Sequence, residues 1–312
     1  MMLARVADSL YWIGRYVERA EHMCRLCDVM LNATLDPDDA AAEVAHIALA
    51  SAGAPAAPGV GAYEAALSLA LDRHAPGSIA SALSRARENA RQVRDQITTE
   101  TWERLNLIFL RITDPEAPRA FAGGSSAFLH DIIADLHLFK GAADATMSHG
   151  EGWRFLLLGT HLERAQLIAR LLEVCFGSHQ DRISHDHLLL TSLLRMSCAL
   201  EPYLRAHTSD LQAAYILRFL LLDEDFPRSV RFCTARIEEH VSALGRPAAP
   251  GHASPERLAG RLRARLQYAD MEEVQTSGPA EFVLQISEAC AGIHTALHET
   301  FVAYPLELRL PA

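Results

Sequence analysis

The strongest helical signal of this chain is LYWIGRYVERAE, residues 10–21, which contains the motif Gly-x-x-x-Glu-Arg-Ala. Around this motif, apolar side chains recur at steps of three and four residues from Leu10 to Leu31. This spacing is typical of a long amphipathic helix with one continuous apolar stripe, about six turns in length. We therefore expect a largely buried helix near the start of the chain.

The rest of the chain shows the same helical periodicity, and sustained period-two alternation, the sign of a strand, is nearly absent. Stretches rich in glycine and proline at residues 51–61, 114–126 and 246–255 are predicted loops between helical segments. We expect an all-α protein, folded as a multi-helix bundle of roughly ten to twelve helices.

The Glu-Arg motif occurs twice. Gly14–Ala20 aligns with Gly159–Ala165, which lies 145 residues further along the chain. A second block, Leu71–Ile79, aligns with Leu222–Val230 and shares an aspartate and a Pro-x-Ser turn. Chance similarity between amphipathic helices would be limited to core positions, whereas these blocks share a glycine, a Glu-Arg pair and a turn. We infer that the bundle is formed from two diverged copies of one helical unit.

The predicted copies lie within a single domain of residues 1–312, because a chain of 312 residues suffices for one large helical domain. The first copy spans about residues 3–112 and the second about residues 126–304.

Composition and charge narrow the class of protein. Half of the residues are hydrophobic and 22% are charged, which favours an ordered core over a disordered chain. The net charge of −10 argues against a protein that coats nucleic acid. Six scattered cysteines suggest no disulfide framework, and neither a signal peptide nor an apolar stretch of membrane-spanning length is evident. We expect a soluble cytoplasmic protein without a nucleic-acid or membrane partner.

The two charged residues of the motif fall on different sides of a helical wheel. Arg19 lies in an extended apolar arc, and Glu18 lies on the opposite, polar side; Arg164 likewise shares its face with apolar residues. A buried guanidinium requires a carboxylate or several carbonyl groups, because an unpaired buried charge is costly. Each motif therefore needs a partner from elsewhere in the fold.

The duplication suggests that partner. If the two motif helices pack side by side, Arg19 meets Glu163 and Arg164 meets Glu18. A glycine one turn before each glutamate would permit the two helices to approach closely. Two interpretations stay open: a bidentate clamp that fixes the helix register, or a pocket for a carboxylate, amine or phosphate ligand. The residues concerned are Arg15, Glu18, Arg19, Glu163 and Arg164.

A second group of polar residues is a candidate pocket wall, with a solvated helix face as the alternative. Its members are Arg87, Glu88, Arg91, Asp144, Glu151 and Trp153. No Glu-x-x-His pair is placed for a di-metal site, and both cysteines of Cys24-x-x-Cys27 lie on the apolar stripe. No nucleophile–histidine pair or phosphate-binding glycine loop is evident. We predict neither a metal nor a cofactor, and whether the protein is an enzyme stays open.

Several of these segments together resemble the bacterial alpha-E domain family. They are LYWIGRYVERAE at residues 10–21, ARENAR at 86–91, EGWRFLLLGTHLERA at 151–165 and LLDEDFPRSV at 221–230. The resemblance extends from Leu3 to about Val302. It implies an all-α fold and association with circularly permuted ATP-grasp ligases and with transglutaminase-like proteins, hence with systems that make or trim amide bonds.

The resemblance suggests a helical accessory partner of an ATP-grasp amide ligase, which binds an amino-acid-like ligand through its Glu-Arg motifs. One alternative is an enzyme that uses the motif carboxylates in acid–base or metal chemistry, and another is a structural oligomerisation module. Homo-oligomerisation is left open. In the family the second motif usually has an arginine where this chain has Thr160, so one half of the site is expected to differ.

Overall fold

The computed structural model describes residues 2–35, 39–54, 59–183, 186–207, 210–248 and 252–303. All helices and turns discussed below lie in these ranges, and they contain no strand. The predicted end of the second copy, residue 304, lies outside the described residues. The all-α prediction is confirmed, with sixteen α-helices and one π-helix in the described part of the chain. This number exceeds our prediction because four helices are shorter than nine residues.

The helices are α1 (Ala4–Ala33), α2 (Asp39–Ala52), α3 (Ala62–Leu71), α4 (Ile79–Gln92), α5 (Thr99–Thr113), α6 (Ala117–Gly123), α7 (Ser125–Thr146), α8 (Glu151–Phe176), α9 (Gln180–Ile183), α10 (His187–Met196), α11 (Leu200–His207), α12 (Ala213–Leu222), α13 (Val230–Leu244), α14 (Pro255–Tyr268), α15 (Met271–Ser277), α16 (Pro279–Leu297) and the π-helix η1 (His298–Val302). The segment 114–126, predicted as a loop, contains α6 and the start of α7.

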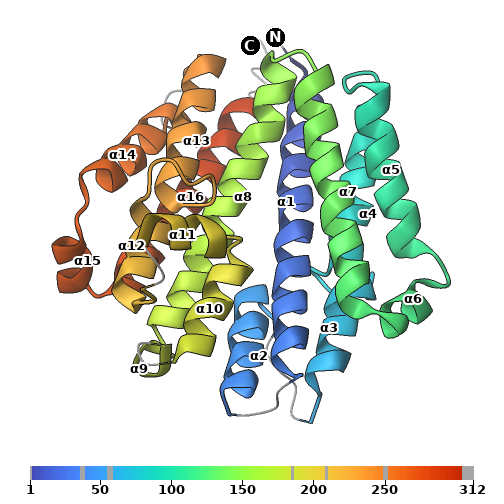
Figure 1. The fold of residues 1–312 in the computed structure, drawn as a ribbon. Helices are drawn as coiled ribbons and strands as arrows, with labels where there is room; N and C mark the ends of the chain where they lie inside the picture. Colours follow the sequence, from blue (N-terminus) through green and yellow to red (C-terminus); the bar gives the residue numbers. More distant parts are fainter. Residues whose placement is uncertain are drawn as a thin grey trace, which may run out of the picture.

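The two motif helices, α1 and α8, lie side by side in the middle of the molecule (Figure 1). Helices α4 and α7 pack on α1, and α5 packs on both of them. Helices α13 and α16 pack on α8, and α14 packs on both of them. The motif helices are therefore covered from several directions, which places their polar residues inside the bundle.

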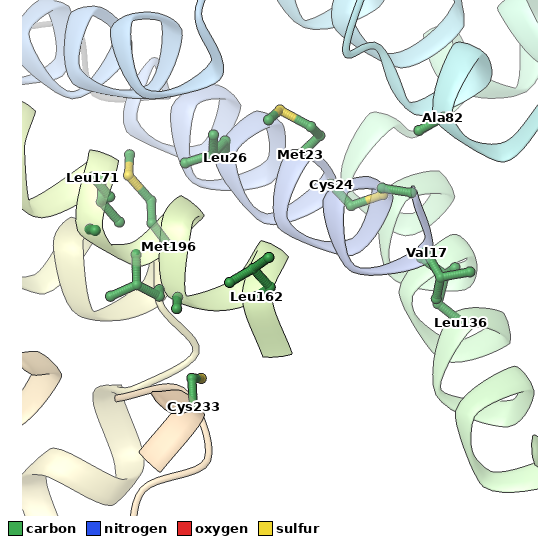
Figure 2. Close-up of a cluster of buried hydrophobic side chains, with 14 of the residues drawn as sticks. Val17, Met23, Cys24, Leu26, Ala82, Leu136, Leu162, Leu171, Met196 and Cys233 are labelled. Carbon is green, nitrogen blue, oxygen red and sulfur yellow. The ribbon is translucent and has the colours of Figure 1, made fainter. Parts of the chain in front are cut away.

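The core between these helices is continuous. Its side chains come from α1, α4, α7, α8, α10 and α13, and Figure 2 shows examples from each, among them Val17, Leu136 and Leu162. Cys24 and Cys27 are buried in it, and burial raises the pKa of the Cys27 thiol to about 12. Both act as small apolar residues, as the sequence predicts. None of the described helices combines the length and the hydropathy that a bilayer span requires.

Two glycines allow α1 and α8 to touch backbone to backbone. A Cβ atom on Gly14 would lie 2.0 Å from the carbonyl oxygen of Leu156, and one on Gly159 would lie 1.9 Å from that of Tyr11. Any side chain there would force the helices apart. The contact is reciprocal, because Leu156 lies 145 residues after Tyr11, the same separation as between the two glycines. The close approach expected from the sequence is confirmed.

The second repeated block also has matching local structure. Ser78 caps α4 by accepting a hydrogen bond from the backbone N–H three residues later at 3.0 Å, and Ser229 caps α13 in the same way at 3.0 Å. Each serine hydroxyl also donates to the carbonyl oxygen of an aspartate, Asp72 or Asp223, six residues earlier. These equivalent contacts are what a duplication requires; the duplication itself stays a prediction.

Candidate functional site

The carboxylate of each Glu-Arg motif binds the arginine of the other. Glu163 accepts a hydrogen bond from Nε of Arg19 at 2.6 Å. Glu18 accepts two from Arg164, from Nε at 2.7 Å and from Nη2 at 2.8 Å. The crosswise pairing predicted from the sequence is therefore present, and α1 and α8 are joined by ion pairs as well as by the glycine contact.

The wheel assigned the wrong environments to the two residues of the first motif. Glu18 is completely buried, as are Glu21 and His22 beside it, whereas the side chain of Arg19 is 27% exposed. The wheel treats one side of a helix as solvated. Here α4, α7 and α8 surround α1, so its polar arc faces other helices and not water.

Around Glu18 the ion pairs form a closed cluster. Lys140 of α7 bridges the carboxylates of Glu18 and Glu21, at 2.5 Å from each. Arg228, which precedes α13, contacts both carboxylates as well, with 3.1 Å between its Nη1 and Glu18. Arg25 binds Glu21 at 2.8 Å. We call these residues, together with Arg164, the Glu18 cluster.

Sequence reasoning missed Glu21, Lys140 and Arg228. One signal was available for Lys140, because it is the only lysine among 312 residues. A single lysine in a helix rich in apolar residues suggests a specific carboxylate partner, since burying its charge unpaired would be costly.

The electrostatics of the Glu18 cluster keep its carboxylates ionised. Burial alone would raise the pKa of Glu18, but Arg164, Lys140 and Arg228 together hold it well below its ordinary value. Burial acts on Glu21 in the same direction and is likewise outweighed, chiefly by Arg228 and Lys140. Both glutamates are thus permanent anions at neutral pH, and all their oxygens are occupied by cations.

Thr160 makes the two halves of the network different. Its position corresponds to Arg15, whose Nε binds Glu163 at 2.5 Å. Thr160 instead donates to the carbonyl oxygen of Leu156 and brings no charge to Glu18. Arg228 supplies that charge, and it stands in the Pro-x-Ser turn where the first copy has Gly77. The two halves therefore differ: the second arginine that binds the glutamate comes from the motif helix in one half and from the Pro-x-Ser turn in the other.

On the Glu163 side the network opens into a cavity of about 730 Å³. Arg15, Arg19 and Glu163 form one part of its wall, and Arg170 of α8 forms another. The guanidinium of Arg170 makes no ion pair or hydrogen bond within the described residues; it lies against Gly53, where a Cβ atom would be 3.1 Å from Nη2. We call this space the Glu163 cavity.

One residue of the Glu163 cavity wall has a buried hydroxyl without a hydrogen-bond partner among the described residues. Ser51 is 2% exposed, lines the cavity, and its Oγ has no hydrogen bond within the described part of the chain. Buried polar atoms in native proteins are nearly always bonded, and an exception suggests a missing water or ligand. Ser51 thus joins Arg170 as an unused donor on the same wall.

Arg15 is held rigidly in this wall. Its Nη1 donates to the hydroxyl of Tyr11 at 3.1 Å and its Nη2 to Gln166 at 2.5 Å. The Tyr11 hydroxyl in turn bonds Nδ1 of His294 at 2.8 Å. Burial raises the pKa of Tyr11 to about 12, so the phenol stays neutral. All three nitrogens of the Arg15 guanidinium donate hydrogen bonds within the protein, so Arg15 orients Glu163. Arg19 and Arg170 are the arginines of this wall that can still bind a ligand.

The predicted pocket wall does not exist as one surface. Glu88 and Arg91 are exposed and pair with each other at 2.7 Å, which is the solvated face named as the alternative. Arg87 donates to Asn106 at 3.0 Å. Asp144 is exposed, Trp153 stacks on a histidine, and Glu151 alone of the six lines a described cavity, of about 300 Å³ at the other end of α8. The structure does not bring the six residues together as one wall, because they lie on α4, α7 and α8 and have different partners.

Metal binding has no support from the arrangement of ligands. Among the residues that the structure describes, no three histidine, cysteine, aspartate or glutamate side chains are grouped closely enough to hold an ion.

The fold and the network define a class of protein: a helical bundle whose two central helices exchange Glu-Arg ion pairs. The chain belongs to the Alpha-E family, described as "a predicted alpha-helical domain with a conserved ER motif", whose model matches residues 2–302. The resemblance seen in the sequence is therefore confirmed.

The chain is also similar to uncharacterized proteins of Mycobacterium bovis (strain ATCC BAA-935 / AF2122/97) and of Mycobacterium tuberculosis (strains CDC 1551 / Oshkosh and ATCC 25618 / H37Rv). Identity is 26% over 333 aligned residues in each case. The match covers 98% of this chain but 37% of each relative, so the chain spans little more than a third of their length. No solved structure matches the chain significantly.

Proposed function

We propose that the protein is a helical accessory partner of an ATP-grasp amide ligase and that the Glu163 cavity binds an amino-acid-like ligand of that reaction. The observation that carries the ligand assignment is the Glu163 cavity itself, which one half of the Glu-Arg network lines with uncommitted donors. Its volume of about 730 Å³ lies within the range of about 300–1,000 Å³ that is usual for small-molecule sites.

The lining of the cavity suits a zwitterion. Within the described residues, Arg19 uses only Nε, for Glu163, and Arg170 has no partner, so two guanidinium groups can bind a carboxylate. Glu163 and Glu173 on the same wall supply negative charge for an ammonium group. An α-amino acid or a short peptide carries both a carboxylate and an ammonium group.

The Glu18 cluster has the opposite character and serves as the structural clamp. It joins α1, α7, α8 and the segment before α13, and every carboxylate oxygen in it is occupied. Carboxylates held ionised by surrounding cations are poor general bases, because an effective base has a pKa near the working pH. This property disfavours the alternative that Glu18 performs acid–base chemistry. It supports the proposal that a partner protein catalyses the reaction.

The length of the mycobacterial relatives also supports a partner. Because the region similar to this chain makes up 37% of each, in those proteins it is joined to a much longer segment. A domain that is covalently joined to others in some proteins commonly works beside them as a separate chain elsewhere. We propose a circularly permuted ATP-grasp ligase as that partner, with a transglutaminase-like protein as a second component, and a cytoplasmic location where ATP is available.

The direct test is a reconstituted reaction. A circularly permuted ATP-grasp ligase from the same genome is purified with and without this chain, and ATP-dependent amide formation from mixed amino acids is followed by mass spectrometry. We expect the chain to bind the ligase and to increase product formation. Product formation that is unchanged by omitting the chain, together with no measurable binding, would overturn the proposal.

The substitution Glu163→Gln distinguishes a structural role of Glu163 from a role in ligand binding. Glu163→Gln keeps the size of the side chain but removes the charge that orients Arg15 and Arg19. If the folded variant binds the ligase yet no longer raises product formation, the cavity has a functional role. A folded variant with full effect would reduce Glu163 to a structural residue.

A further inference from the structure

A smaller pocket of about 60 Å³ adjoins the Glu163 cavity. It lies between the side of α1 and the first two turns of α4, and Arg19 and Gly77 line both spaces. The guanidinium of Arg19 is placed over the ring of Tyr16, with 5.7 Å between its Cζ and the ring centre. Ser81 and Arg85 of α4 complete the polar lining. We call this space the Arg85 pocket.

The polar groups of the Arg85 pocket are unused donors. Arg85 makes no ion pair or hydrogen bond within the described residues, and the two Nη atoms of Arg19 are likewise free. Ser81 is 6% exposed as a residue, and its hydroxyl has no hydrogen-bond partner in the part of the chain that the structure describes. Donor groups of Arg19, Ser81 and Arg85 therefore meet at this pocket without a protein acceptor among the described residues.

The charged side chains that line the Arg85 pocket are both cations. Arg19 and Arg85 line it, and no aspartate or glutamate does. The pocket also lies beside the N-terminal turns of α4, a helix of 14 residues whose dipole adds partial positive charge there. Such a local excess is notable in a chain of net charge −10, and it attracts an anion.

Comparison of the two halves shows why the space exists. In the second copy the position of Gly77 is held by Arg228, whose guanidinium enters the network and binds Glu18 and Glu21. In the first copy Gly77 has no side chain, and a Cβ atom there would meet nothing within 4 Å. The half that has Arg228 is filled by protein, and the half that has Gly77 is left open.

We propose that the Arg85 pocket binds an oxyanion of the size of phosphate, held by Arg19, Arg85 and the hydroxyl of Ser81. The pocket has a volume of about 60 Å³, which is enough for a group of the size of phosphate. Because Arg19 also lines the Glu163 cavity, one ligand with both an amino-acid part and a phosphoryl group can occupy both spaces. In that respect the inference rests on the proposed function; binding of phosphate alone does not.

The test is calorimetric titration of the full chain with inorganic phosphate at constant ionic strength. We expect saturable binding to the unmodified protein and binding weaker by about tenfold or more in Arg85→Ala, since charge-assisted hydrogen bonds are lost. Ser81→Ala should weaken binding by a smaller factor. Arg91→Ala is the matched control, because Arg91 is an exposed arginine of the same helix that is paired with Glu88.

Two results overturn the proposal: absence of saturable binding, or an equal loss in Arg91→Ala, which would indicate general electrostatic attraction. A parallel titration with O-phospho-L-serine identifies the source of the oxyanion. Tighter binding than that of phosphate, weakened by both Arg85→Ala and Arg170→Ala, assigns a phosphoryl group on a larger ligand. Equal binding of the two compounds, insensitive to Arg170→Ala, assigns free phosphate and leaves the amino-acid site of the Glu163 cavity unsupported.

Discussion

Glu18 illustrates at the scale of a residue how this protein tolerates charge in its interior. Its carboxylate is fully removed from solvent but receives Arg164, Lys140 and Arg228. The desolvation cost of such a cluster is high, and the attraction between the charges offsets it only when every partner is present. Removing one member is therefore expected to lower the free energy of unfolding by more than the intact cluster adds to it.

The first prediction concerns this residue. Glu18→Gln leaves three cations facing a neutral amide, and we expect the free energy of unfolding to fall by about 3–5 kcal/mol. Urea denaturation followed by circular dichroism measures the change. Glu88→Gln is the control, because Glu88 is an exposed carboxylate, and it should leave the free energy of unfolding nearly unchanged. Similar small effects of both substitutions would contradict the role given to the Glu18 cluster.

Residue by residue, the sequence predicted the crosswise pairs but not the complete network. Arg19 with Glu163 and Arg164 with Glu18 followed from the repeat and from the need to pair a buried guanidinium. Lys140 and Arg228 lie more than a hundred residues from their partner along the chain, and no repeat relates them to it. The buried position of Glu18 was missed because a wheel describes one helix without its neighbours.

At the scale of the elements, the contact between α1 and α8 depends on two glycines. Such backbone contacts have no space for even one methyl group, because the nearest atoms are carbonyl oxygens of the facing helix. The ion pairs lie within one or two turns of the contact, so helix separation also sets their lengths.

The second prediction follows from this geometry. Gly14→Ala or Gly159→Ala forces the helices apart, and we expect a loss of about 3 kcal/mol or more in the free energy of unfolding. Gly141→Ala is a matched control in α7, since a Cβ atom there would meet nothing within 4 Å. Because alanine favours a helix over glycine, this control should gain about 0.5–1 kcal/mol. Thermal unfolding of the three variants distinguishes the cases, and a stable Gly14→Ala protein would refute the close contact.

At the scale of the elements, the long helices could be predicted from the sequence, but the cavity and the short helices could not. Long helices with regular apolar spacing, α1 and α8 above all, were recognisable, as was the order of helices around the repeated blocks. The Glu163 cavity was not, because its wall combines α1, α2, α8 and the turn before α4, and only the folded chain brings these together. Short helices such as α6 were missed because a single turn or two leaves too few residues for a periodic pattern.

For the whole molecule, buried histidines predict how stability depends on pH. His22 in α1 and His240 in α13 have no hydrogen-bond partner at either ring nitrogen within the described residues. Burial is the main cause that lowers the pKa of each to about 4, against about 6.5 in an unfolded chain. Burial also lowers the pKa of His161, which stacks on His240.

The third prediction is a loss of stability on mild acidification. The unfolded chain binds more protons than the folded one wherever the pH lies between the two pKa values. The contribution of these histidines is therefore complete above about pH 6.5 and is lost progressively as the pH falls toward about 4. Urea denaturation across this range measures the slope. A free energy of unfolding that is constant between about pH 7 and about pH 5 would contradict the burial of these rings.

The substitution His240→Phe tests how much one of these histidines contributes to the pH dependence of stability. The ring packs edge-on against Trp153 and has no hydrogen bond to lose, so phenylalanine should keep the stability at neutral pH and reduce its decline in acid. A variant whose stability declines as steeply as that of the unmodified protein would show that His240 does not titrate with folding.

The proposed function requires that the Glu163 cavity binds a ligand of the ligase reaction. Arg170→Ala tests this requirement most directly, because Arg170 lies in the cavity wall and makes no ion pair or hydrogen bond with any described residue. The measurement is the rate of ATP-dependent amide formation by the partner ligase in the presence of Arg170→Ala, compared with the unmodified chain and with Arg91→Ala. We predict that Arg91→Ala supports the full rate and that Arg170→Ala lowers it by about tenfold while folding normally. Equal rates with all three proteins would contradict the assignment of the Glu163 cavity.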